Sequence, residues 1–317
     1  MPVPTSIRRS PAVGLLAVLA TLLAASACGS SSSGGTNGAA GASSAAAAPS
    51  AGASGTSQRG DAGDPKSLVP AEIRKSGVIR AATDGTYPPN EFTGPDGKTL
   101  MGFDIDLGQA VAQRLGLKID FANAKFDSIL TGIQGNRYDV AFSSFTDNKD
   151  RQAKVDFVDY FTAGTSIIVK KGNPEKITKL EDLCGKKVAL ESGTVQVKIA
   201  EGAKCTGGKK IDVSQLPDDA AARLQVKTGR AVADMNDFPV AAYTAKTSGG
   251  GNDFEVVGTQ YETAPYGIAV SKDLGGLRDA IAATLKAMVA DGSYDAVLKK
   301  WDIGQGALKD ITINAGS

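Results

Sequence analysis

The sequence predicts an α/β fold of two lobes, each a mostly parallel sheet flanked by helices. After Pro70, short apolar runs alternate with amphipathic segments, the pattern of strands that alternate with helices. The order of residue types in 224–237 matches that in 130–144: each has the end of a helix, then a Gly, an Arg, an apolar strand and polar residues. This repetition suggests a second lobe of similar build. Because ligands of open α/β sheets bind beyond the carboxyl ends of the strands, the polar residues that follow strands in both halves predict a cleft between the lobes.

In the first half, each expected element ends at a recognisable signal. The strand 78–82 ends at Thr83, Asp84 and Gly85, and the helix 103–115 begins with Asp104 as N-cap and stops at Gly116. Further elements are expected as strand 117–121, helix 127–134, strand 138–142, which delivers Ser143 and Ser144, and strand 166–170.

The second half follows the same logic. We expect a strand at 187–190 that opens at 191–194 into a helix, a helix at 218–227, a strand at 231–235 that ends at Asn236 and Asp237, a strand at 267–270, and helices at about 277–289 and 294–301. Lobe 1 is expected to comprise residues 68–166 and 263–317, and lobe 2 residues 167–262.

Composition excludes several classes of function. The 317 residues carry a net charge of +1 and contain no histidine. A net charge this close to zero lacks the excess of basic residues that nucleic-acid-binding proteins carry, so nucleic acid is not expected as a partner. Without histidine there is no Ser-His-Asp or Cys-His nucleophile and no imidazole metal site. We expect neither a metal nor a cofactor.

The N-terminal residues are expected to be an export signal rather than part of the folded domain. Arg8 and Arg9 precede an apolar run at 12–25, followed by small residues and Cys28, so residues 1–27 are expected to be a signal peptide. The run is shorter than the roughly 20 residues that span a bilayer. The Cys after small residues resembles a bacterial lipobox, which implies a lipidated Cys28, although Ala25 stands where Leu is usual. An ordinary signal peptide with an incidental Cys is the alternative.

A tether and a cysteine pair follow from composition. In the stretch 29–60, 26 of the 32 residues are Gly, Ser or Ala, so residues 28–67 are expected to form a disordered tether that holds the domain at the membrane. With Cys28 modified, Cys184 and Cys205 are an even pair in an exported domain, which favours a disulfide. Two buried free thiols are the alternative.

The order and spacing of the motifs resemble the amino-acid-binding subunits of ATP-driven importers, solute-binding protein family 3. The resemblance covers nearly all of residues 68–302 and rests on short motifs within 83–89, 97–107, 126–130, 138–146, 151–157, 192–194 and 266–270, with Asp237. It implies a two-lobed periplasmic-binding-protein-like (type II) fold, a lipid-anchored protein outside the cytoplasm, and a monomeric one.

The resemblance also assigns binding roles for a zwitterion. It makes Arg151 the clamp for the ligand carboxylate, a role that suits a planar guanidinium, and Asp237 the partner of the ammonium. It gives polar contacts to Ser144, Thr146 and Thr194, and aromatic walls to Tyr87 and Phe126. The alternatives are a solvated Arg151 in a charged turn, an Asp237 that caps a helix, and rings that belong to plain core. Asn90 departs from the family, where an aromatic residue often stands.

Two carboxylates bear on selectivity. Asp84 and Glu191 fall at positions that face the ligand side chain in relatives, which would disfavour an acidic ligand and favour a cationic or amide one. Either acid could instead be held by Lys98, Lys187 or a backbone N–H.

The expected function is capture, not catalysis. A free amino acid binds between the lobes, which close by hinge motion near 164–167 and 259–264, and the closed form engages an ABC permease whose ATPase is a separate chain. Alternatives are an enzyme on the same fold, such as a dehydratase or a murein lyase, or a sensor that reports to a membrane receptor through another chain. A further alternative keeps the transport function but replaces the amino acid with another ligand, such as an opine or a polyamine.

Overall fold

The structure, a computed structural model, describes residues 63–317. The predicted signal peptide, Cys28 and most of the predicted tether lie outside these residues. The described part confirms an α/β architecture, in which one eight-stranded sheet has the order β5-β1-β6-β11-β7-β10-β8-β9. Its strands are β1 (Val78–Thr83), β5 (Lys118–Asn123), β6 (Val140–Ala141), β7 (Asp156–Lys170), β8 (Lys187–Glu191), β9 (Asp212–Leu216), β10 (Ala233–Asp237) and β11 (Phe254–Val270).

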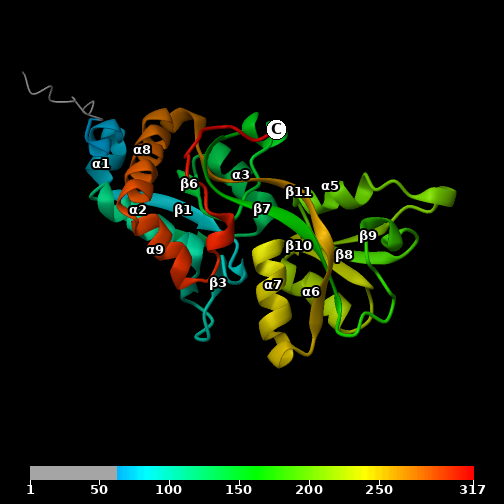
Figure 1. Cartoon of the computed structure of the whole chain (residues 1–317). Helices are drawn as coiled ribbons and strands as arrows, with labels where there is room; N and C mark the ends of the chain where they lie inside the picture. Colours follow the sequence, from blue (N-terminus) through cyan, green and yellow to red (C-terminus); the bar gives the residue numbers. More distant parts are fainter. Residues whose placement is uncertain (1–62) are drawn as a thin grey trace, which may run out of the picture. The chain divides into compact units, whose positions relative to one another are not determined.

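Two long antiparallel strands join two parallel groups in this sheet. β5, β1 and β6 are parallel to one another, and so are β10, β8 and β9, whereas β7 and β11 pair antiparallel along almost their whole length. Figure 1 shows β7 and β11 side by side. The expected strands 166–170 and 267–270 are therefore the carboxyl-terminal parts of two longer strands. A small sheet, β2 (Thr86–Tyr87), β3 (Glu91–Thr93) and β4 (Leu100–Met101), was not expected from the sequence.

Helices cover the sheet. They are α1 (Ala71–Ser76), α2 (Phe103–Arg114), α3 (Phe126–Gln134), α4 (Lys149–Gln152), α5 (Val195–Glu201), α6 (Asp219–Lys227), α7 (Phe238–Thr247), α8 (Gly275–Asp291) and α9 (Ser293–Lys300). Short 3-10 turns, η1 to η6, lie at Pro65–Leu68, Leu180–Leu183, Thr206–Gly208, Ser248–Gly251, Lys272–Leu274 and Gly304–Gly306.

The expectation that Asp104 caps α2 is wrong. Gly102 is the N-cap, and Asp104 lies within the first turn of the helix. The Asp104 carboxylate is fully buried, where it accepts hydrogen bonds from the Ser144 backbone N–H at 2.9 Å and from the Tyr160 hydroxyl. Long-range packing, which a local capping pattern does not encode, decides the role of this carboxylate.

The apolar core falls into two groups. Two clusters draw all their fully buried members from 69–163 and 266–311, and two others draw theirs from 167–254. β7 and β11 contribute to both groups, so each group stabilises one end of the two long strands. Burial of apolar surface is the main favourable term in folding, and each end of the sheet buries a separate set of apolar side chains.

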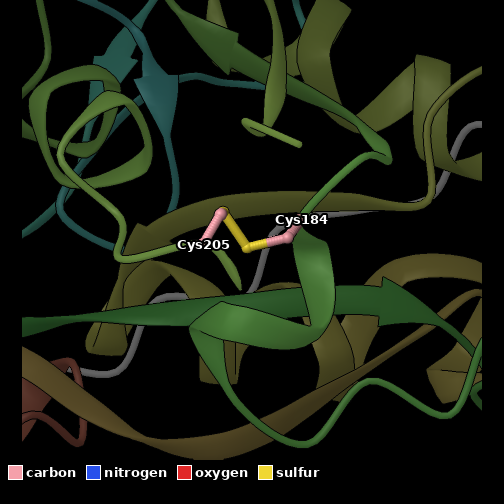
Figure 2. The surroundings of a disulfide bond; sticks show 2 residues. All are labelled: Cys184 and Cys205. Atoms are coloured by element: carbon pink, nitrogen blue, oxygen red, sulfur yellow. A yellow bond between two sulfur atoms is a disulfide. The ribbon is translucent and has the colours of Figure 1, made fainter. Parts of the chain in front are cut away.

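Cys184 and Cys205 form a disulfide, in keeping with the pairing expected from the sequence. Their Cα atoms are 5.6 Å apart, within the usual range for a disulfide. The bond joins the end of η2 to the start of η3 (Figure 2). Cys205 is partly buried against the core cluster of Ile177, Leu183 and Val188.

Removal of the disulfide is expected to destabilise the protein. The bond closes a loop with a sequence separation of 21, which contributes about 3 kcal/mol in the chain-entropy model. The double variant Cys184→Ser/Cys205→Ser should therefore unfold roughly 6–12 °C below the wild type in calorimetry. Reductant should lower the wild-type midpoint equally and leave the double variant unchanged. Identical midpoints for oxidised wild type and double variant would contradict this expectation.

Candidate functional site

A small cavity brings together residues from both halves of the chain. Its volume is about 10 Å³, and it is lined by Tyr87, Phe126, Ser143, Ser144, Thr146, Arg151, Thr194, Val195, Gln196 and Asp237. Seven of the nine predicted ligand-binding residues therefore meet at one place. Asp84 and Glu191 do not line it. A larger recess of about 610 Å³ lies at the other end of β1, beside Val78 and Arg80, and none of the predicted site residues lines it.

Arg151 is a buried cation held by carbonyl groups. Only 8% of the residue is exposed, so it is not the solvated arginine of the alternative interpretation. Its guanidinium donates to the Thr146 carbonyl at 2.8 Å and to the Gly193 carbonyl at 3.0 Å, and lies over the Phe126 and Phe145 rings. Burial lowers the pKa of Arg151 to about 10, far enough above neutrality for the group to stay charged. In the described residues no carboxylate forms a salt bridge with it.

Asp237 provides the opposite charge in the same cavity. It occupies the N-cap position of α7, but its side chain makes no capping hydrogen bond. Instead, its Oδ1 accepts from the Gln196 amide at 2.8 Å. Burial raises the pKa of Asp237 to about 6, and hydrogen bonding and the nearby Arg151 charge oppose this rise. The carboxylate is therefore mostly ionised at neutral pH.

The hydroxyl side chains differ in what they can offer a ligand. The Ser144 hydroxyl donates to Glu91 Oε2 at 3.0 Å and accepts from the Asn90 amide at 2.9 Å. The Thr194 hydroxyl donates to the Glu191 carbonyl at 2.9 Å. Since both hydroxyl protons are already engaged, Ser144 and Thr194 can offer a ligand an acceptor oxygen or a backbone group. Thr146 also lines the cavity.

Asp84 and Glu191 lie behind the cavity, where both are almost fully buried. Asp84 accepts from the Thr86 hydroxyl at 2.8 Å and from the Phe126 backbone N–H at 3.0 Å. Glu191 accepts from the Tyr87 hydroxyl through Oε2, and its Oε1 has no hydrogen-bond partner among the described residues. Burial and the neighbouring carboxylates raise the pKa of Glu191 to about 10. Lys187 pairs with Asp212 rather than with Glu191.

Sequence reasoning missed the groups that support the site. Gln196 fixes Asp237, and Asn90, Glu91 and Asp104 fix Ser144. Ser144 adopts a positive φ of 48°, unusual for a residue other than glycine, because its backbone N–H and its hydroxyl are both held by buried carboxyl groups. In the sequence, Asn90 stands out only as a departure from the family. Its polar side chain is the one local sign that it supports the site through a hydrogen bond.

Five polar contacts cross the cavity region from residues 84–151 to residues 191–223. Lys125 and Asp218 pair at 2.7 Å, Lys198 pairs with Asp150, and Arg223 donates to the Thr86 carbonyl at 3.3 Å. The Tyr87–Glu191 and Arg151–Gly193 hydrogen bonds are the other two. Their exposed members are weak, because solvent screens exposed ion pairs.

The cavity must widen to admit anything larger than water. A volume of about 10 Å³ corresponds to roughly one water molecule. A recess of about 190 Å³ shares Phe126, Arg151 and Thr194 with it and has Lys154 and Lys198 farther out. This recess is the natural place for the cavity to open.

Within residues 63–317, no helix has both the length and the apolar character needed to cross a bilayer. In the same range, no group of three or more acidic or cysteine side chains is arranged to hold a metal ion.

Comparisons with known proteins agree on one family. The profile for bacterial extracellular solute-binding proteins, family 3, matches residues 79–305. The arginine-binding protein ArgT of Corynebacterium glutamicum is 32% identical over 78% of this chain and 82% of its own length. The L-cystine-binding protein TcyJ of Escherichia coli K12 is 31% identical over 73% of this chain and 84% of its own length. A solved ancestral arginine-binding protein bound to arginine is 38% identical, with a TM-score of 0.65, over 71% of this chain and 98% of its own.

The raised pKa of Glu191 predicts a pH-dependent effect of Glu191→Gln on stability. The native carboxyl keeps its proton up to a pKa of about 10, whereas the unfolded chain ionises near the ordinary value of 4.5. Wild-type stability therefore falls as the pH rises through this window, because unfolding releases a proton. Glutamine does not titrate, so the variant should gain stability relative to wild type progressively from pH 5 to pH 8.

Thermal midpoints of ligand-free protein at pH 5, 6, 7 and 8 measure this difference. Glu201→Gln, at an exposed position, is the matched control and should give a constant difference. A difference for Glu191→Gln that does not change with pH would contradict the prediction.

Proposed function

The chain belongs to family 3 of the bacterial extracellular solute-binding proteins, and we propose that it captures a free amino acid, preferably one with a cationic side chain, for an ABC importer. The observation that carries this proposal is the burial of Arg151 and Asp237 in one cavity. A free amino acid has a carboxylate and an ammonium at a fixed separation, so its binder needs a fixed cation and a fixed anion. The permease and its ATPase are separate chains, and capture involves no catalysis.

Arg151 is the proposed clamp for the ligand carboxylate. Its guanidinium makes two hydrogen bonds to carbonyl oxygens and none to a carboxylate among the described residues. Arg can bind a carboxylate through two parallel, charge-assisted hydrogen bonds, which are about twice as strong as neutral ones. The guanidinium carbon lies 5.4 Å from the centroid of the Phe126 ring and 5.1 Å from that of the Phe145 ring. Asp237, held by Gln196, is the proposed partner of the ammonium.

The carboxyl groups behind Tyr87 support a cationic ligand. Asp84, Glu191 and Asp219 form a group of buried carboxyl groups next to the cavity, in which Asp84 and Asp219 disfavour the ionised form of Glu191. A ligand carboxylate there would be repelled in the same way, whereas a guanidinium or ammonium would favour the ionised carboxylates and pair with them. Two relatives are named as arginine-binding proteins, which supports a cationic ligand. Another relative is named as a cystine-binding protein, so cystine, a disulfide-linked amino acid, is the alternative ligand.

We propose that the lobes comprise residues 68–166 with 263–317, and 167–262, and that they move about the two long strands. The division of the core supports these bounds. β7 and β11 lose their regular register between Val257 and Ala264, where Gly258 and Glu262 have positive φ. This irregular segment overlaps the predicted hinge at 259–264. Opening there would part the contacts that cross the cavity and admit the ligand.

The proposal includes a membrane anchor. Lipidation of Cys28, followed by the Gly/Ser/Ala-rich stretch up to residue 67, would hold a monomeric domain near the permease outside the cytoplasm. A flexible stretch of about 40 residues has a root-mean-square span of roughly 35 Å, enough for the domain to rotate freely. Loss of the protein from the membrane fraction in Cys28→Ala would support the anchor, and unchanged fractionation would refute it.

A thermal-shift panel tests the ligand class. The panel comprises the twenty amino acids, ornithine, citrulline and putrescine, added to protein that has been unfolded and refolded to remove bound ligand. A ligand at 100 times its dissociation constant should stabilise by about 2.7 kcal/mol. Arginine, lysine and ornithine should give the largest shifts. A shift with glutamate or aspartate alone would overturn the cationic preference, and a response only to putrescine would overturn the zwitterion site.

Arg151→Ala should abolish measurable binding. The substitution leaves a desolvated ligand carboxylate without its partner, which costs about 3–5 kcal/mol, or more than roughly 100-fold in affinity. Calorimetric titration with the best ligand of the panel measures the loss, and a cooperative thermal transition verifies folding. Arg137→Ala, at an exposed position of the same half, is the matched control and should bind like wild type. Near-wild-type affinity in Arg151→Ala would refute the site.

A further inference from the structure

Two buried carboxyl groups meet behind the cavity without a cation between them. Glu191, at the end of β8, is 3% exposed, and Asp84, after β1, is 2% exposed. The two groups share their surroundings: Glu191 accepts from the Tyr87 hydroxyl, Asp84 accepts from the Thr86 hydroxyl and the Phe126 N–H, and the Tyr87 and Phe126 rings are 6.3 Å apart. Glu191 Oε1 has no partner among the described residues, while Oε2 accepts from the Tyr87 hydroxyl.

The charged groups around this pair do not neutralise it. Lys125, just before α3, pairs with Asp218 at 2.7 Å, and its charge opposes but does not cancel the rise in the pKa of Asp84. Arg223 of α6 pairs with Asp219. Asp219 itself is buried and repels a charge on Glu191. Tyr87 offers a hydroxyl but no positive charge. Neither Asp84 nor Glu191 therefore forms a salt bridge within the described part of the chain.

Two adjacent buried carboxyl groups cannot both ionise without a nearby cation, because each ionised group raises the energy of the other. One proton must therefore stay on the pair at neutral pH. Burial is the first cause that raises the pKa of both groups; the Asp84 charge raises the pKa of Glu191 further, whereas the contact with Glu191 opposes the rise for Asp84. The titration belongs to the pair as a unit rather than to one residue.

We propose that Asp84 and Glu191 hold one shared proton, and that a cationic ligand side chain displaces it, so that capture exchanges one proton for one organic cation. This inference rests on the proposed function and adds the proton as a second species handled by the same site. When the halves part, the Tyr87–Glu191 hydrogen bond opens, and a guanidinium or ammonium can donate to both carboxylates. The proton leaves to solvent, so the net charge of the buried pair and its occupant stays the same.

The exchange makes the choice of ligand depend on pH. Without its proton, the pair is a dianion that matches one extended cation. With the proton, it offers one O–H donor and acceptor oxygens, the complement of a neutral side-chain amide such as that of glutamine. Acidic conditions therefore favour a neutral amide ligand, and alkaline conditions a cationic one.

Proton release can be counted by titration calorimetry of the full chain with L-arginine at pH 7 in phosphate and in Tris. These buffers differ in ionisation enthalpy, so the difference in apparent binding enthalpy gives the number of protons released. We expect about one proton per arginine, and an affinity that tightens about tenfold per pH unit between pH 6 and 8. L-Glutamine, titrated in the same way, should release about none.

Two variants assign the proton to the pair. Glu191→Gln should bring the release with arginine to about zero, and the exposed control Glu201→Gln should keep it near one. If Glu191→Gln does not fold or bind, the wild-type pH dependence and the comparison of arginine with glutamine decide the question.

The outcomes separate the two proposals. Arginine binding with less than about a third of a proton released, or with the same release from arginine and glutamine, overturns the exchange and leaves the proposed function standing. Unchanged release in a Glu191→Gln variant that still binds also overturns it. No arginine binding at all overturns the cationic preference and the exchange together.

Discussion

Within residues 63–317, Arg151 is buried and charged without a salt bridge to any carboxylate, and the proposed site depends on this arrangement. Isolated buried charges are costly, and proteins usually neutralise or pair them. Here two backbone carbonyls and two aromatic rings hold the guanidinium. This support is weaker than a salt bridge, so the cation keeps a strong capacity for an incoming carboxylate. An internal carboxylate in that position would pair with the guanidinium and block the proposed binding of a ligand carboxylate.

The rest of the fold serves this constraint. The Thr146 carbonyl follows β6, and the Gly193 carbonyl follows β8, so the guanidinium contacts both parallel groups of the sheet. Only β7 and β11 connect these groups within the sheet, and their register is irregular between Val257 and Ala264. In the proposed function, a site supported from both sides of this irregular connection would close on its ligand, and the ligand's own charges would supply the free energy of closure.

The sequence predicted the fold class and seven residues that line the cavity, and the failures of the sequence analysis have physical causes. Alternating strands and helices, and the even pair Cys184 and Cys205, are local signals. The resemblance assigned Arg151 and Asp237 to one ligand, and both residues line the same cavity. Asp104 was mistaken for a cap because its partners, Ser144 and Tyr160, lie 40 and 56 positions away. For the same reason, no local pattern distinguished Asp84 and Glu191, which lie behind the cavity, from Thr146, which lines it. Gln196 was missed because a glutamine in a helix carries no signal of its own.

Titration of the full chain with L-arginine, L-argininamide and Nα-acetyl-L-arginine tests the central claim most directly. The amide lacks the carboxylate that Arg151 would bind, and the acetyl derivative lacks the ammonium that Asp237 would bind, while both keep the guanidinium. The account predicts that each change weakens binding by more than roughly 100-fold, because each leaves one buried charge unpaired. Binding of either analogue with the affinity of arginine would contradict a site built for both charges of a free amino acid.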